Sequence, residues 1–321
     1  MSKLRPFHVL IAAAAAAGLT LTACGSNDVV PVSQAGAGTI TVQTNTGELT
    51  VPVKPERVVA LDSTSFETLH EFGITPVAVP KELLPASLSE WADNPAIIDV
   101  GTHREPRLEE INAAEPDLIV GGKRFAEYTE TLSSTAPVVD LAPSVEAAEY
   151  VDALKHQTTV LGEIFQAQSE AERLNTELDA AVAEAAGLTN GQTVFLANHN
   201  GGKIDNGGGR MAPLIEPLDM TDVFAADRGG SDQVHNDSGL SPETIAQANP
   251  DWVFVLDRDA STGSGGAPAQ ATIEAQELWG NTTFMSEGQV LYLDNDFYRT
   301  EGISAYTNFY LQLAEALQGT V

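Results

Sequence analysis

The chain has 321 residues, 43% of them hydrophobic, and its 16 Lys and Arg stand against 45 Asp and Glu for a formal net charge of −29. Nucleic acids bind basic protein surfaces that neutralise their phosphates. This strongly acidic composition therefore argues against nucleic acid as a partner. The hydrophobic content is that of a globular protein, and about 300 residues exceed one ordinary core, which indicates two domains.

The first 23 residues have the pattern of an export signal. Lys3 and Arg5 precede an apolar run, residues 9–17, that is too short to span a bilayer. The run is followed by Leu-Thr-Ala-Cys24, which resembles the lipobox of bacterial lipoproteins, in which the cysteine is lipidated and the peptide before it removed. We expect a signal peptide at 1–23, a lipid anchor on Cys24 and a tether at 24–38. The alternative is an ordinary secretory signal with an incidental cysteine.

Residues 39–144 alternate between short strand and helix patterns. Apolar and polar residues alternate on both sides of a glycine-containing turn at 39–51, which predicts a hairpin. Residues 58–61 predict a buried strand, residues 66–72 a helix, and residues 76–79 another strand. This alternation predicts an N-terminal α/β lobe.

Residues 145–187 have a different composition, without proline and rich in Ala, Glu, Gln and Leu. Apolar residues at helical spacing predict one very long helix, or two nearly collinear ones. A helix of about 40 residues would be ~60 Å long and could join two lobes. The α/β pattern then resumes with strands at 193–197 and 252–256 and a last helix at 304–317, so residues 188–321 predict a second lobe.

One sequence pattern occurs in each predicted lobe. Residues 108–120 read LEEINAAEPDLIV, and residues 242–254 read PETIAQANPDWVF. Glu, Ile, Pro and Asp match at identical spacing, and each copy predicts a helix that proline stops before a buried strand. We therefore expect an α/β fold of two Rossmann-like lobes, joined by one long backbone helix, with a ligand cleft between them.

The lipobox, the repeated Glu-x-Ile-x4-Pro-Asp-apolar motif and the joining helix resemble the substrate-binding lipoproteins of iron–siderophore ABC importers. These belong to the helical-backbone class of periplasmic binding proteins, which also includes vitamin B12 and haem binders. The resemblance covers nearly the whole mature chain. It implies a monomeric receptor on the extracytoplasmic face of the cell membrane, with no intrinsic cofactor. Its partners would be a ferric siderophore and an ABC permease with its ATPase.

Basic residues follow the strands of both repeats. Lys123 and Arg124 follow the first strand and Arg258 the second, and Arg124 and Arg258 are equivalent when counted from the repeated Pro-Asp. Ligands of open α/β sheets lie beyond the carboxyl ends of strands, so these side chains should face the cleft. Arg210, after a glycine cluster, and Arg299 are further candidates. Because the family's catecholate binders carry an Arg or Lys triad here, the resemblance implies an anionic ferric catecholate, with Lys123 and Arg124 competing for one position. Solvated surface arginines are the alternative.

The resemblance also implies iron ligands. His235, in the loop before the second repeat, would ligate iron when the siderophore leaves coordination positions open, and Tyr298 would be its partner. Arg299 competes with Tyr298 for the family's tyrosine position, and His235 has the alternative of an ordinary loop histidine.

Glu109 and Glu243 occupy the matching glutamate positions of the two repeats. In the family these glutamates pair with arginines of the membrane permease. The alternative is that both only favour the N-terminus of a helix.

The chain has no Gly-x-Ser-x-Gly elbow and no His-Glu-x-x-His motif, so we expect no enzyme. A lipid-anchored hydrolase is the competing class. Among binding proteins the alternatives are haem, cobalamin and hydroxamate-siderophore receptors, and a zinc receptor is disfavoured because the chain has no His-rich loop.

Overall fold

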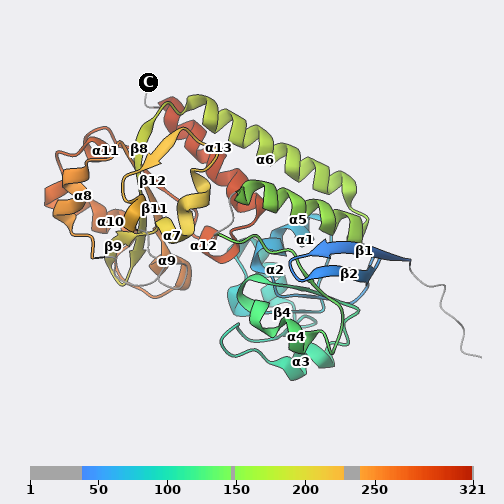
Figure 1. The fold of residues 1–321 in the computed structure, drawn as a ribbon. Coiled ribbons are helices and arrows are strands. Elements are labelled where there is room, and N and C mark those ends of the chain that lie inside the picture. Colours follow the sequence, from blue (N-terminus) through green and yellow to red (C-terminus); the bar gives the residue numbers. More distant parts are fainter. Residues whose placement is uncertain (1–37, 146–148, 228–238, 320–321) are drawn as a thin grey trace, which may run out of the picture. The chain divides into compact units, whose positions relative to one another are not determined.

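A computed structural model describes residues 38–145, 149–227 and 239–319 (Figure 1). The expected signal peptide, Cys24, nearly all of the expected tether and His235 lie outside the described residues. No helix in the described ranges is long and apolar enough to cross a membrane.

The first lobe contains a hairpin and a parallel sheet, as the sequence predicts. In the hairpin, β1 (Thr39–Thr44) pairs antiparallel with β2 (Gly47–Pro52). The sheet has the order β5-β4-β3-β6-β7, with all neighbours parallel. Its strands are β3 (Val58–Ala60), β4 (Ala78–Val79), β5 (Ile98–Asp99), β6 (Leu118–Gly121) and β7 (Val138–Asp140). The helices are η1 (Ser63–Ser65), α1 (Phe66–Glu71), η2 (Lys81–Leu83), η3 (Ala86–Leu88), α2 (Ser89–Asp93), α3 (Leu108–Ala113), η4 (Lys123–Tyr128) and α4 (Thr129–Leu132).

The second lobe repeats this architecture around a sheet of order β10-β8-β11-β12, in which β9 adds antiparallel to β8. Its strands are β8 (Gln192–Asn200), β9 (Lys203–Asn206), β10 (Met220–Asp222), β11 (Trp252–Asp257) and β12 (Val290–Tyr292). The helices are α7 (Gly208–Met211), η5 (Ala212–Leu214), η6 (Ala225–Asp227), α8 (Pro242–Ala248), α9 (Arg258–Thr262), α10 (Ala269–Glu274), η8 (Glu277–Trp279), α11 (Thr283–Ser286), α12 (Phe297–Thr300) and α13 (Ile303–Gly319). Both copies of the repeated motif form a helix and then a buried strand, α3–β6 and α8–β11.

The joining segment differs from the expectation of one long helix or two collinear ones. It forms two helices, α5 (Tyr150–Phe165) and α6 (Gln168–Leu188), that pack antiparallel. Lys155 Nζ lies 2.7 Å from Asp179 Oδ1, and Asn175 Nδ2 donates to Thr159 Oγ1 over 2.9 Å. The chain reverses at Gln166, whose φ of 57° ends α5. The expectation of one continuous or collinear helix is wrong, because helix propensities do not indicate that Gln166 adopts a left-handed conformation and ends α5.

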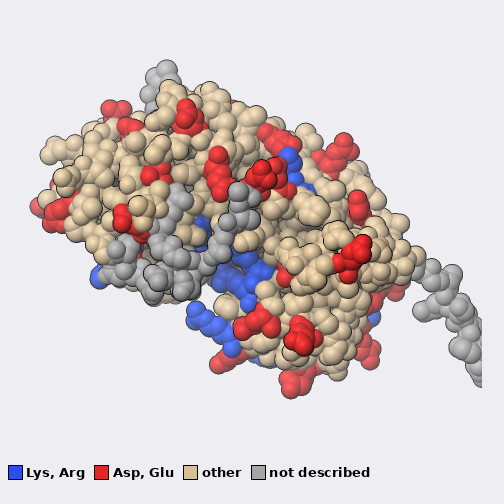
Figure 2. Space-filling model, viewed as in Figure 1, with Lys and Arg blue, Asp and Glu red and all other residues tan. Residues whose placement is uncertain are grey.

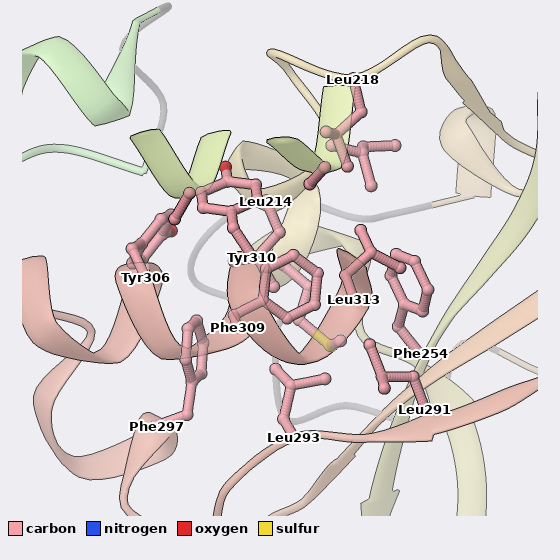
Figure 3. Packing of buried hydrophobic residues seen from close by; sticks show 14 of the residues in the cluster. Leu214, Leu218, Phe254, Leu291, Leu293, Phe297, Tyr306, Phe309, Tyr310 and Leu313 are labelled. Atoms are coloured by element: carbon pink, nitrogen blue, oxygen red, sulfur yellow. The ribbon is translucent and has the colours of Figure 1, made fainter. Parts of the chain in front are cut away.

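Helix α5 contributes to the cores of both lobes. Tyr150 and Leu154, at its start, pack in the core of the second lobe, whereas Leu161 and Ile164 pack in that of the first. Figure 3 shows part of the second core, where α13 presents its apolar side chains to the sheet. Because close-packed cores resist rearrangement, sharing one helix limits how far the lobes can move against each other.

Gly302, just before α13, lies against the first lobe. A Cβ atom built there would overlap the carbonyl oxygen of Thr64, whereas one on Gly319 would meet nothing within 4 Å. We predict that Gly302→Ala lowers the free energy of unfolding by about 1–3 kcal/mol, because neither backbone can yield easily. Urea denaturation measures this, with Gly319→Ala as the matched control. Equal midpoints for the two variants would show that the contact is not tight.

Candidate ligand-binding site

A cleft of about 570 Å³ lies where β6 and β11 end, with lining residues from both lobes. The lining consists of Glu82, Leu83, Thr102, His103, Arg104 and Arg124 from the first lobe and Arg258, Ser261, Thr262, Ser264, Tyr298 and Arg299 from the second. Figure 2 shows Lys and Arg side chains gathered in a hollow at the centre of this face, with acidic side chains scattered around them. The volume falls in the range of small-molecule sites.

Three arginines surround the ring of Tyr298. The guanidinium carbons of Arg124, Arg210 and Arg258 lie 5.2, 4.8 and 5.6 Å from the ring centroid, which is cation–π distance. Arg258 Nε donates to the Tyr298 hydroxyl over 3.3 Å, and Arg124 Nη2 donates to the Tyr298 carbonyl over 3.0 Å. Burial raises the pKa of the Tyr298 phenol, but the three positive charges bring that pKa below its ordinary value. The structure thus brings together three of the four arginines that the sequence singled out, Arg124, Arg210 and Arg258.

Arg124 reaches the cleft through an unusual backbone turn after β6. Gly122 has a φ of 103° and Lys123 a φ of 48°. Only glycine fits at 122, because an added Cβ would overlap the carboxylate of Asp140. The turn places Arg124 on the cleft, whereas Lys123 lines a smaller adjoining cavity of about 340 Å³, together with Arg124 and Arg210.

Arg258 is held by groups at the ends of two neighbouring strands. Its Nη1 donates to Asn200 Oδ1, at the end of β8, over 2.6 Å. The preceding Asp257 caps α9 by accepting from the Ala260 amide, and it also accepts from buried His199 at 2.8 Å. His199 therefore has a structural role here. Asn200 is a site residue that sequence reasoning missed, and its only signal was its place at a strand end.

Glu301 is a second residue that sequence reasoning missed. Its side chain is 3% exposed and lies 2.7 Å from Lys123 Nζ, and it also pairs with Arg210. Burial would raise the pKa of this carboxyl, but Arg210 and Lys123 lower it to about 2. The ionised carboxylate therefore stabilises the fold at neutral pH, and that contribution is lost as the pH falls from the ordinary glutamate range toward 2.

Arg299 lines the cleft but is engaged in joining the lobes. Its Nη1 donates to the carbonyls of Glu82 and Leu84 over 2.8 and 3.1 Å, and its Nε donates to that of Ser261 over 2.9 Å. Arg299 adds a positive charge to the lining of the cleft, but these N–H groups are directed at backbone carbonyls and not into the cavity.

His103 also lines the cleft. Burial and the nearby charges of Arg124 and Arg104 lower the pKa of His103, which favours the neutral imidazole. Of the two expected iron ligands, Tyr298 lies on the cleft and His235 falls outside the described residues. No group of three or more His, Cys, Asp or Glu side chains suited to a metal occurs among the described residues.

The two glutamates of the repeats lie in exposed first turns of helices, Glu109 in α3 and Glu243 in α8. Ser241 caps α8 by accepting from the Thr244 amide over 3.2 Å. Hydrogen bonds at this helix start lower the pKa of Glu243, which keeps that exposed carboxylate charged.

Comparison with known proteins identifies the family. A family model described as "Periplasmic binding protein" matches residues 58–297. The petrobactin-binding protein YclQ of Bacillus subtilis is 30% identical over 290 residues, which are 86% of this chain and 87% of that protein. The ferric-anguibactin-binding protein FatB of Vibrio anguillarum is 29% identical, with 80% of each chain covered. A solved structure of the catecholate-siderophore-binding protein VctP from Vibrio cholerae has a TM-score of 0.77 at 26% identity and covers 88% of this chain and 100% of that one.

These matches confirm the expected fold class, an α/β fold of two lobes. The model match alone spans well over half of the sequence. The chain belongs to the periplasmic binding protein family.

Proposed function

We propose that this protein is an extracytoplasmic receptor that binds a ferric siderophore of the catecholate type and delivers it to an ABC permease for iron uptake. The observation that carries the proposal is the cluster of Arg124, Arg210 and Arg258 around Tyr298 on the cleft. The names of the relatives support it, since YclQ is a petrobactin-binding protein and FatB a ferric-anguibactin-binding protein.

The electrostatics of the cluster suit an anionic aromatic ligand. A pair of unit charges about 5 Å apart gains roughly 3 kcal/mol at an effective dielectric of ~20, before desolvation is counted. The acidic exterior does not cancel this attraction, because charges beyond about 8 Å are largely screened at physiological salt. Arginine also stacks on aromatic rings, and a ferric catecholate is both aromatic and negatively charged.

Tyr298 and His235 are the proposed iron ligands for a siderophore that leaves coordination positions open. Tyr298 lines the cleft, and the arginines beside it favour the phenolate, the form that binds iron. His235 enters this proposal from the sequence alone.

The proposal includes attachment to the cell membrane. Residues 1–23 would direct export, Cys24 would carry the lipid, and residues 24–38 would tether the receptor near the permease. A flexible linker of about 14 residues reaches roughly 20 Å. Glu109 and Glu243 would bind the permease, which works with its ATPase, and the receptor would act as a monomer.

Other ligands of the same class remain as alternatives. A hydroxamate receptor is favoured by one relative, the iron(3+)-hydroxamate-binding protein FhuD of Bacillus subtilis, which is 22% identical over 88% of this chain. Haem and cobalamin are disfavoured because four arginines, Arg104, Arg124, Arg258 and Arg299, line the cleft. A lipid-anchored hydrolase is the remaining alternative from another class, although the family consists of substrate-binding proteins.

A titration of the purified protein tests the ligand class. We expect a ferric catecholate to quench tryptophan fluorescence saturably, while ferric hydroxamate, haem, cobalamin and the iron-free catecholate have little effect. Generic ester substrates added in parallel should not be turned over. Tighter binding of haem, cobalamin or the hydroxamate than of the catecholate would overturn the proposal.

A further inference from the structure

A buried carboxylate lies at the inner end of the arginine cluster. Glu301 follows α12 with a φ of 52° and pairs with Lys123 from the first lobe and with Arg210 from the second. All three side chains are poorly exposed, 3% for Glu301 and 15% for each of the cations. Glu301 therefore lies between the two cations and pairs with both. Its negative charge offsets the repulsion between the two poorly exposed positive charges.

The position of the carboxylate is itself fixed by the surrounding backbone. The Glu301 carbonyl accepts from the hydroxyl of buried Tyr150 over 3.1 Å. The next residue, Gly302, lies so close to Thr64 of the first lobe that it has no space for a side chain. The carboxylate thus sits at a constrained point between the lobes.

Each partner of Glu301 adjoins a ligand-binding arginine or is one. Arg210 has the shortest of the three guanidinium distances to the Tyr298 ring, 4.8 Å. Lys123 immediately precedes Arg124 in the turn whose backbone has positive φ at 122 and 123. The ion pair between Glu301 and Lys123 therefore also fixes the turn that places Arg124 on the cleft.

We propose that Glu301 is a positioning residue of the ligand site, fixing Arg210 against Tyr298 and holding the Lys123–Arg124 turn of the opposite lobe. Glu301 lines neither the 570 Å³ cleft nor the adjoining 340 Å³ cavity, whereas Lys123 and Arg210 line that smaller cavity, so Glu301 acts through these partners. The inference rests on the proposed function, because it concerns the same anion site.

Charge and geometry predict opposite results when Glu301 is changed. By charge alone, removing a carboxylate beside an anion site strengthens anion binding. If Glu301 instead acts by positioning its partners, removing its carboxylate releases Arg210 and weakens anion binding. A hydrogen bond to a charged group contributes enough to binding that its loss changes affinity by about tenfold or more. The expected result is that Glu301→Gln and Glu301→Asp both bind a ferric catecholate at least about tenfold more weakly than the wild type does.

Glu301→Asp separates the two effects, since it keeps the charge but moves it by one methylene. It also keeps the inference testable if Glu301→Gln does not fold. Glu163→Gln, on the exposed side of α5, is the matched control for loss of one carboxylate and should bind like the wild type.

Double-mutant cycles test whether Glu301 acts through Arg210. We expect Glu301→Gln to add only part of its own loss to that caused by Arg210→Met, because only the contact with Lys123 is then left to lose. It should add fully to the loss caused by Arg258→Met, whose side chain is anchored separately on Asn200. A general loosening of the fold would add equally in both cycles.

Failure of this inference is distinguishable from failure of the proposed function. If the wild type binds no ferric catecholate, the proposed function fails. If the wild type binds and Arg210→Met weakens it, but both Glu301 variants bind as tightly or more tightly, the positioning role is refuted. Full additivity with Arg210→Met would refute it as well.

Discussion

Replacement of Arg258 by glutamate is expected to abolish ferric-catecholate binding while leaving thermal unfolding close to that of the wild type. The side chain donates to neutral groups, Asn200 Oδ1 and the Tyr298 hydroxyl, so no ion pair of the fold is broken. Reversal removes an attraction of roughly 3 kcal/mol and adds a repulsion of similar size, which together correspond to a loss of about four orders of magnitude in affinity. Fluorescence titration measures the loss, and circular dichroism on heating measures the fold.

Arg107→Glu is the matched control for this charge reversal. Arg107 is 57% exposed and pairs with Asp99 at 3.0 Å, and it does not line the cleft. The net charge changes by the same amount, so a general electrostatic effect would weaken both variants alike. Wild-type affinity in Arg258→Glu, or an equal loss in Arg107→Glu, would contradict the assignment of the anion site to the cleft.

The two lobes could be predicted because their signals are local. The pattern of an acidic helix start, a proline stop and an apolar run needs only neighbouring residues, and α3–β6 and α8–β11 formed as expected. The arrangement of α5 and α6 could not be predicted in this way. Their antiparallel packing depends on the left-handed backbone of Gln166, a conformation that a glutamine in the sequence does not indicate, and on the close approach of Gly162 to Ala171, which is a tertiary contact.

The candidate ligand site also contains residues that local sequence signals could identify and residues that they could not. Arg124 and Arg258 could be found because each follows a strand whose end could be located from the repeat. Glu301 is one of 45 acidic residues, and nothing around it in the sequence distinguishes it. Arg299 was expected to bind ligand, but its donors go to backbone carbonyls of Glu82 and Leu84, acceptors that every residue carries and no sequence pattern marks.

Changing both Glu109 and Glu243 to arginine is expected to leave ferric-catecholate binding intact and to stop iron uptake by cells. Both carboxylates are exposed in the first turns of α3 and α8, in matching positions of the two repeats, and neither lines the cleft. Two equivalent acidic points suit docking on a permease with two equivalent basic ones, and reversing both turns attraction into repulsion. Uptake of radioactive iron from the ferric catecholate measures delivery, and titration of the purified variant measures binding.

The matched control for this double variant reverses two other exposed glutamates, Glu110 in α3 and Glu287 after α11. It carries the same change in net charge and leaves the repeat positions untouched, so uptake should stay near the wild-type level. Each single variant, Glu109→Arg or Glu243→Arg, should retain one of the two contacts and give an intermediate rate. Normal uptake by the double variant would show that the glutamates serve only their helix starts, where an acidic residue favourably meets the positive end of the helix dipole.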